Sequence, residues 1–393
     1  MARDTDAVEW LDAEQLPEPF PPHAPRRVWY LLLGAVVAAV TLVLMLTGRH
    51  TKRAASPPRR TRPRAHRPRS ACRSRSVPPT PPLSLINLGH PLLHAPATWE
   101  LVARAGDGVY QIQLATGRIA RASAVLSGSE AVSFLVGPHD VVVRPWDCVN
   151  GVDGYLIRDG HAASALRGML ANCGLALPGP RPGQVWVPND DQHDPKMVLA
   201  DLNGRPTGPS MPGQEYGEVP DGVAYALVTL VGGVYDARPD GLHRITTGWV
   251  LATGPSGYLT EECDQRHTCT MDAIGRRSGT HSVPGPAPDQ FSSGVSGGVI
   301  SPDGDLAALV TQAATDTDTV VLHLIDLGSG TDHATRVTLR ARQQPVGAMA
   351  WSPDSQWLFV ADATGHIVAV DRAGHTLALN TQMPPIEQLT IRY

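Results

Sequence analysis

The sequence predicts an all-β protein, a seven-bladed β-propeller, preceded by one transmembrane helix and a disordered linker rich in arginine and proline. Three observations predict this order. The 393 residues include 38 glycines and 36 prolines, more than helices accommodate without breaking. A turn in which proline precedes a small or polar residue recurs at intervals of 32 to 51 residues. One long uncharged run and one arginine-rich run precede these repeats.

Four segments follow one another along the chain. Residues 1–27 form a short acidic tail, 28–48 the transmembrane helix, 49–83 the linker and 84–393 the propeller domain. From residue 76 onward lie 19 of the 33 basic and 31 of the 37 acidic side chains, a net charge of −12. A domain this acidic repels phosphate groups, so we expect no nucleic-acid partner.

The transmembrane helix is predicted from residues 28–48, a run of 21 uncharged residues. A helix needs about 20 such residues to cross the hydrocarbon core. Trp29 and Tyr30 lie where interfacial aromatics are found, and Arg49 follows the run. The alternative is a cleaved signal peptide, but its charged region would be long and mostly acidic, and no A-x-A site follows. We expect a retained, single-pass anchor in the cell membrane.

The linker carries eleven Lys or Arg and no acid between residues 49 and 75. It has no apolar periodicity, and its repelling charges and repeated prolines favour an extended, solvated chain. A polybasic segment is also attracted to anionic headgroups or an anionic wall polymer, by about 1 kcal/mol per charge near a membrane. A disordered spacer and an electrostatic contact are compatible.

The repeat is clearest at two turns, Pro302-Asp303-Gly304 and Pro353-Asp354, each preceded by serine and followed by an apolar strand. Proline presets φ, Asp caps the local backbone, and Gly takes the conformation that side chains resist. The weaker copies place turns at Pro96, Pro138, Pro188, Pro220 and Pro255. The spacing of these turns brackets the roughly 40 to 50 residues of a four-stranded propeller blade.

The segments 301–310 and 352–360, in which Ser-Pro-Asp-Gly or Ser-Pro-Asp-Ser precedes an apolar strand, resemble the PD40 repeat of TolB-type, WD40-like propellers. The resemblance covers about residues 84–393 and leaves the tail, anchor and linker without a counterpart. It implies an interaction platform or the companion of a hydrolase domain. The repeat turn is structural, so the resemblance assigns no active-site residue.

Cysteines indicate possible disulfides in the propeller. Cys263 and Cys269 flank a predicted hairpin turn, where cross-strand Cβ atoms approach disulfide distance. Cys148 and Cys173 form the natural second pair, and free core thiols are the alternative. No C-x-x-C or zinc-like His/Cys spacing occurs, so we predict neither a metal site nor a cofactor.

Two observations give opposite predictions for the side of the membrane on which the propeller lies. Disulfides place the propeller outside the cytoplasm, whereas the positive-inside rule places the arginine-rich linker inside. We expect an extracytoplasmic propeller, because paired cysteines and a large acidic β domain suit an ectodomain. Arg26 and Arg27 then hold the short N-terminal tail inside.

No linear motif predicts a catalytic residue. Gly294-Val295-Ser296-Gly297-Gly298 spells G-x-S-x-G, but a nucleophile elbow needs a strand before the serine and a helix after it, whereas a propeller strand follows here. The run from Asn189 to Asp194 gathers oxygen and imidazole ligands, yet its spacing fits no EF-hand. A Gly/Ser loop and a solvated turn are the favoured interpretations.

We therefore expect a membrane-tethered, non-catalytic interaction module that binds a protein or a cell-envelope glycan. The alternative is a propeller enzyme, a lyase or hydrolase, whose channel-mouth site no linear motif reveals. Perturbed acids at the channel mouth favour the enzyme, and an aromatic patch favours binding. The sequence predicts no oligomeric state.

Ring closure is expected from the ends of the domain. The segment Leu83–Leu88 is predicted as the outer strand of the last blade, the one that holds residues 351–370. The alternating segment Ile386–Tyr393 is predicted to return to the first blade or to cap its edge.

Overall fold

The computed structural model describes most of the predicted propeller domain. The described residues are 84–393 without 125–131, 147–153, 160, 173, 190–194, 214–218, 231, 265, 267, 285–294, 314–315, 334–337, 341–347, 362–363 and 382. The predicted tail, transmembrane segment and linker lie outside them. Within the described part, no helix has the length and apolar character needed to span a membrane.

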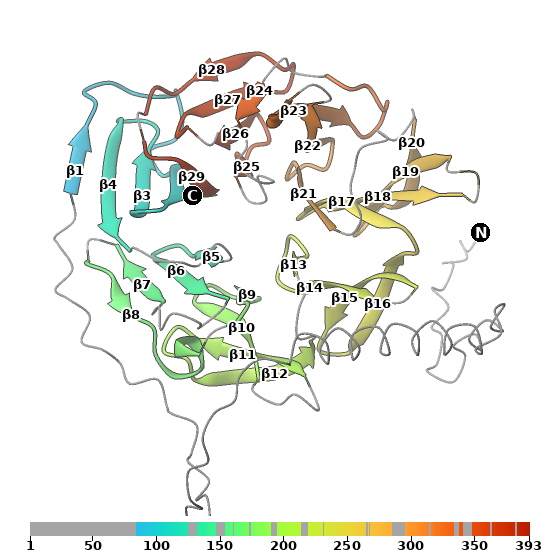
Figure 1. The fold of residues 1–393 in the computed structure, drawn as a ribbon, viewed down its shortest axis with the longest axis horizontal. Coiled ribbons are helices and arrows are strands. Elements are labelled where there is room, and N and C mark those ends of the chain that lie inside the picture. The colour runs from blue at the N-terminus through green and yellow to red at the C-terminus, as the bar shows by residue number, and fades with distance from the viewer. Residues whose placement is uncertain are drawn as a thin grey trace, which may run out of the picture. The chain divides into compact units, whose positions relative to one another are not determined.

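The described residues form an all-β propeller, drawn in Figure 1, whose strands make six hydrogen-bonded sheets. The first sheet has the order β1 (Ser84–Asn87), β4 (Arg118–Ser123), β3 (Gly108–Gln113), β2 (Glu100–Ala105) and β29 (Ile386–Arg392). The second contains β5 (Val132–Val136), β6 (Asp140–Pro145), β7 (Tyr155–Arg158) and β8 (Ser164–Ala165). A short 3₁₀ helix, Gly168–Ala171, follows it.

Three further sheets have four strands each. The third contains β9 (Leu177–Pro178), β10 (Gln184–Pro188), β11 (Lys196–Asp201) and β12 (Pro206–Pro212). The fourth contains β13 (Val219–Pro220), β14 (Ala226–Leu230), β15 (Gly233–Arg238) and β16 (Gly241–Thr246). The sixth contains β25 (Met349–Trp351), β26 (Trp357–Ala361), β27 (Ile367–Asp371) and β28 (Thr376–Ala378).

The fifth sheet has eight strands in two antiparallel halves. One half contains β17 (Trp249–Gly254), β18 (Gly257–Cys263), β19 (Cys269–Gly275) and β20 (Gly279–Val283), and the other β21 (Val295–Ile300), β22 (Leu306–Ala313), β23 (Asp316–Asp326) and β24 (Thr338–Arg340). The innermost strands of the halves, β17 and β21, pair in parallel. The first strands of neighbouring units therefore run in the same direction.

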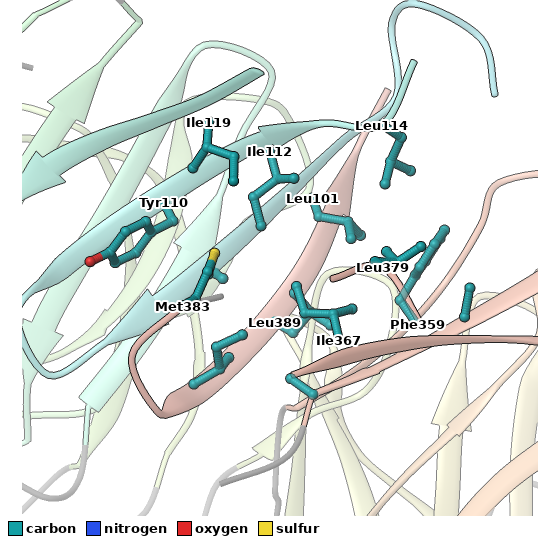
Figure 2. Packing of buried hydrophobic residues seen from close by; sticks show 14 of the residues in the cluster. Leu101, Tyr110, Ile112, Leu114, Ile119, Phe359, Ile367, Leu379, Met383 and Leu389 are labelled. Atoms are coloured by element: carbon teal, nitrogen blue, oxygen red, sulfur yellow. The ribbon is translucent and has the colours of Figure 1, made fainter. Parts of the chain in front are cut away.

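Apolar side chains fill the junctions between neighbouring units. β26 is buried along nearly its whole length, as expected of a strand with neighbours on both faces. At the junction of the first and last sheets, Leu101 and Leu389 pack in one buried cluster with Phe359, as Figure 2 shows. A second cluster joins the two halves of the eight-stranded sheet, with Leu259 on one side and Leu309 on the other. Packing between sheets thus forms the core.

The C-terminal strand closes the ring. β29 is the innermost strand of the first sheet and pairs with β2 from Glu100↔Arg392 to Ala105↔Ile386. The predicted return of Ile386–Tyr393 to the first blade is confirmed.

The predicted placement of Leu83–Leu88 is wrong. Its described part, β1, pairs with β4 and is the fifth, outer strand of the first sheet, not a strand of the last. The last sheet takes its outer strand, β28, from the adjacent hairpin. A short local connection closes at less entropic cost than one between distant segments. The outer position of the last sheet is therefore occupied by β28.

The alternating strands give the propeller two different faces. We call the face with the connections between first and second strands the turn face; it carries 137–139, 179–183, 221–225, 255–256, 301–305 and 352–356. We call the opposite face the loop face; there the second strand of a unit ends and the third begins, and its described residues include 106–107, 146, 154, 189, 195, 232, 264, 268 and 364–366. The connections between sheets also lie on the loop face.

The two clearest predicted repeat turns lie on the turn face, and serine has a role beyond the predicted one. Ser301 Oγ donates to Asp303 Oδ1 at 2.6 Å and accepts the N–H of Leu306 at 3.0 Å. Ser352 Oγ makes the same bond to Asp354 at 2.6 Å. Both serines are completely buried. Gly304 has φ +87°, a conformation that favours glycine, although Ser355 adopts φ +60° at the same position of the other turn.

One of the weaker repeat turns was placed wrongly. Pro188 ends β10 and pairs with Met197, so it lies on the loop face. The turn equivalent to the others is 179–183, which also contains prolines. Sequence spacing could not separate the two positions, because both combine proline with a polar or glycine-rich turn beside an apolar strand.

Candidate functional site

Buried ionisable groups gather at the junction between the fourth sheet and the neighbouring half of the fifth. Asp221 lies in the turn before β14, Asp236 on β15 and Tyr258 on β18. Arg276 follows β19, and Arg238 ends β15. The exposed fractions are 0% for Asp221, 2% for Asp236 and 5% for Tyr258. We call these five residues the Asp221–Arg276 cluster.

Asp221 is fixed by the local turn. Its Oδ1 accepts the backbone N–H groups of Val223, Ala224 and Tyr225 at 2.8 to 2.9 Å. This is the capping role that the Pro-Asp-Gly pattern predicts. Its Oδ2 lies 3.2 Å from Nη2 of Arg276, which also donates to the backbone carbonyl of Asp221.

Asp236 is the centre of the hydrogen-bonded part of the Asp221–Arg276 cluster. Its Oδ2 accepts from Arg238 Nε at 2.8 Å and from the Tyr258 hydroxyl at 3.2 Å. Arg276 also donates to the Tyr258 hydroxyl, and its guanidinium lies 4.4 Å from the Tyr258 ring centre. Two arginines therefore face two buried carboxylates.

The buried position changes the proton affinity of the cluster. Burial, and then the negative charge of Asp221, raises the pKa of Asp236 above its ordinary value. Burial also raises the pKa of Tyr258. Perturbed acids mark functional sites as well as structural ion-pair networks, so accessibility must decide between them.

Accessibility and repetition favour a structural role. The acids of the Asp221–Arg276 cluster are covered, so a substrate could not reach them. A similar bridge recurs between the fifth and sixth sheets, where Arg372 contacts Asp303 and Asp305 of the preceding turn. Each arginine follows the third strand of one unit and contacts a turn of the previous unit. The arrangement locks neighbouring units together.

A second constellation has the geometry of a nucleophile, base and acid. Thr311 Oγ1 lies 2.7 Å from His323 Nε2, and His323 Nδ1 lies 2.7 Å from Asp332 Oδ2. Thr311 is on β22, His323 on β23, and Asp332 in the connection after β23. A hydroxyl, an imidazole and a carboxylate in this order can activate the hydroxyl for attack. Thr311 itself is 8% exposed.

The G-x-S-x-G run is not a nucleophile elbow. Val295–Ile300 is strand β21, so the backbone of Ser296 lies inside a strand and no helix follows it. At Gly298 a Cβ atom would lie 2.4 Å from the carbonyl oxygen of Leu251, so glycine permits the close approach of β17 and β21. The expected Gly/Ser loop is wrong for the described part of the run, because Val295–Gly298 belongs to this strand; Gly294 lies outside the described residues.

The run from Asn189 to Asp194 is described only at its first residue. Asn189 Oδ1 accepts the N–H of Lys196 at 2.9 Å, which closes the base of the connection between β10 and β11. The other four candidate cation ligands lie outside the described residues.

The predicted disulfide between Cys263 and Cys269 is present. The two cysteines are direct partners across the antiparallel pair β18 and β19, with Cα atoms 3.9 Å apart. Cys148 and Cys173, predicted as a second pair, lie outside the described residues. Glu261, which is 4% exposed, lies beside the disulfide of Cys263 and Cys269. One of its carboxylate oxygens and the two sulfurs lie within 4.8 Å of one another.

One aromatic side chain is both exposed and fixed on the loop face. Trp146 directly follows β6 and is 45% exposed. Its Nε1 donates to Ser133 Oγ at 3.0 Å, and the same oxygen accepts the N–H of Ala176 at 2.7 Å. The indole thus has one polar anchor and one free apolar surface, which suits an interface. The sequence signal that could have found it is a tryptophan directly after a strand-ending proline.

Comparison with known proteins identifies no family for this chain. No family model and no curated protein matches the chain. A protein of unknown function from Desulfotomaculum acetoxidans is 13% identical with a TM-score of 0.44, covering 74% of this chain and 98% of its own. TolB from Acinetobacter baumannii is 13% identical with a TM-score of 0.38, covering 75% and 66%.

A putative 6-phosphogluconolactonase from Bacteroides fragilis is 11% identical with a TM-score of 0.46, covering 77% of this chain and 99% of its own. At these identities and TM-scores, the likenesses assign neither a family nor a function to this chain.

Proposed function

We propose that this chain is a non-catalytic interaction module, a seven-bladed propeller held at a membrane by residues 28–48 and separated from it by the linker 49–83. The loop face of the propeller binds a protein or a cell-envelope glycan. The fixed, exposed indole of Trp146 is the observation that carries this proposal.

The blade number rests on the eight-stranded sheet. Each half has the four-stranded antiparallel order of a complete blade, and only the innermost strands join the halves. Away from these innermost strands, the two halves pack against each other through a buried cluster that includes Leu259 and Leu309. Similar clusters lie between the other units. Two blades in this sheet and one in each of the other five give seven.

The contrast between the two faces supports binding by the loop face. Turn-face connections are short and hydrogen-bonded internally, as at Asp221 and Ser301. On the loop face, Trp146 begins the connection from β6 to β7, and Asn189 begins the connection from β10 to β11. Loops positioned by a rigid scaffold are where binding residues concentrate. Tryptophan is among the residues that contribute most to binding interfaces.

An extracytoplasmic propeller is part of the proposal. The disulfide between Cys263 and Cys269 supports it, because such bonds persist in oxidising compartments. The arginine-rich linker then meets the outer membrane surface or an anionic wall polymer. Protease protection of the full-length chain in sealed, oriented membrane vesicles tests the sidedness.

A comparison of two surface variants tests the binding face. The immobilised chain is incubated with the membrane and wall fraction of its own cell, and captured proteins and glycans are identified. Trp146→Ala should lower the retained amount of a specific partner at least about tenfold. Val223→Ala, an equally exposed apolar residue on the turn face, should leave it unchanged. Equal capture by both variants would reject Trp146 as a binding residue.

A second candidate function is hydrolysis, favoured by one observation, the hydrogen-bonded chain of Thr311, His323 and Asp332. The low exposure of Thr311 places it second. Thr311→Val keeps the shape of the side chain and removes the hydroxyl. Hydrolysis of small activated esters by the natural chain, abolished in Thr311→Val, would favour the enzyme; equal rates would exclude this constellation.

A further inference from the structure

The hairpin of β18 and β19 brings three potential metal ligands to its tip on the loop face. Cys263 and Cys269 are cross-strand partners, and Glu261 lies two residues before Cys263 on the same strand. Side chains at i and i+2 of a strand project from the same face. The two sulfurs and one Glu261 carboxylate oxygen lie within 4.8 Å of one another.

We propose that this hairpin is a redox-gated metal site, in which reduction of the disulfide frees Cys263 and Cys269 to bind a thiophilic divalent cation of the Zn²⁺ class together with Glu261. The oxidised hairpin does not bind the ion, because the sulfur lone pairs of a disulfide are poor donors compared with thiolates.

A dithiol reductant supplies the electrons and protons that the reduction of the disulfide consumes. One dithiol transfers two electrons and two protons to the disulfide, which gives two cysteine thiols and the oxidised, cyclic form of the reductant. The cation then displaces one proton from each thiol, so binding of one ion releases two protons. Two thiolates and one carboxylate leave a fourth position for water or an external ligand.

The ligand spacing suits a tetrahedral ion. With Zn–S bonds of about 2.3 Å and a Zn–O bond of about 2.1 Å, neighbouring ligand atoms lie roughly 3.5 to 3.8 Å apart. After the S–S bond breaks, rotation about the Cα–Cβ bonds can separate the sulfurs to this distance. The carboxylate oxygen is already within 4.8 Å of both.

The hairpin keeps its register without the disulfide. Asp264 N donates to Thr268 O at 2.9 Å, directly beyond the cysteine pair. Asp264 Oδ1 accepts the N–H groups of Thr268 at 2.9 Å and Arg266 at 2.7 Å. These bonds preorganise the two strand ends, so the thiols remain opposite each other after reduction.

Burial and exposure are distributed as a metal site requires. Glu261 is 4% exposed, so its carboxylate lies on the buried side of the cysteine pair. Cys263 is exposed, so an ion and a reductant can reach the pair from solvent. The neighbouring acid, Glu262, uses its carboxylate to accept from Thr246 and Thr247 and takes no part in the site.

Zinc binding by the full-length chain tests the proposal. The untreated chain, the phosphine-reduced chain and the reduced Cys263→Ser/Cys269→Ser variant are titrated anaerobically with Zn²⁺ against a chromophoric chelator. The reduced natural chain should bind one equivalent more than either of the others. The double variant keeps the remaining cysteines, so the difference reports this pair alone. Equal stoichiometry in all three would overturn the proposal.

The carboxylate is tested with a matched pair of variants. Glu261→Gln should weaken Zn²⁺ binding by the reduced chain at least about tenfold, since loss of outer-shell partners alone costs about 10- to 100-fold. Glu262→Gln should leave the affinity unchanged. Equal affinities in the two variants would overturn the role of Glu261.

X-ray absorption at the zinc edge of the reduced natural chain decides the ligand set if Glu261→Gln fails to fold. Two sulfur neighbours with oxygen support the site, and fewer than two sulfurs contradict it.

Discussion

Deletion of residues 386–393 removes the innermost strand of the first blade. β29 pairs with β2 along its whole length, and the strand edge of β2 is left unpaired without it. The deletion also removes Ile386 and Leu389, which are 5% and 4% exposed and belong to the cluster between the first and last sheets. The change therefore opens the ring at its closure.

The magnitude follows from the lost burial and one lost ion pair. Burying each of the two side chains contributes about 1.5 to 3 kcal/mol. Arg104, 6% exposed, loses both Glu387 and Gln388. An unpaired buried charge costs about 3 to 5 kcal/mol, and the 45% exposure of Glu387 places this pair at the lower end. The total is about 6 to 9 kcal/mol, comparable to the whole stability of a typical domain.

Urea denaturation followed by tryptophan fluorescence measures this loss. Trp99 lies in the affected cluster and Trp357 packs against it, so both report on the closure. A chain lacking only Tyr393, which is 75% exposed and follows β29, is the control and should change by less than about 0.5 kcal/mol. A chain ending at 385 that remains monomeric and unfolds within about 1 kcal/mol of the control would refute the closure argument.

Four further substitutions give testable outcomes. Ser352→Ala should lower the free energy of unfolding by about 1 to 3 kcal/mol in urea denaturation, because the Asp354 carboxylate and the backbone N–H of Trp357 both lose the hydroxyl of the fully buried Ser352 as their partner; a change below that range would contradict the role of serine. Arg276→Gln should cost about 3 to 5 kcal/mol, since it leaves the fully buried Asp221 without its cation.

Arg372→Gln should cost about 1 kcal/mol or less, because that pair is about one-third exposed; equal losses for Arg276 and Arg372 would contradict the burial argument. The pKa of Asp236 is raised in the folded chain, so the native state holds its proton more tightly and stability falls as pH rises through and above the ordinary value of 3.8. Asp236→Asn should remove this decline, which denaturation midpoints across pH 4 to 7 would show as a smaller loss than in the natural chain.

The sequence by itself determined the local chemistry of the propeller. Proline, aspartate and glycine at 302–304 predicted a tight turn, because each residue type restricts the backbone there in a known way. Cys263 and Cys269 predicted a cross-strand pair, because only a hairpin turn separates them. The return of the last strand was predictable from its alternating pattern and from the need to cover an edge.

The tertiary structure alone decided which distant residues meet. Arg276 contacts Asp221 across 55 residues, and Arg104 contacts Gln388 across 284. The approach of Thr311 to His323 carries no linear signal either. The placement of β1 on the first sheet escaped prediction for the same reason. The alternating pattern along a strand determines which side chains project from each face of a blade. The packing of neighbouring blades determines which residues those side chains contact.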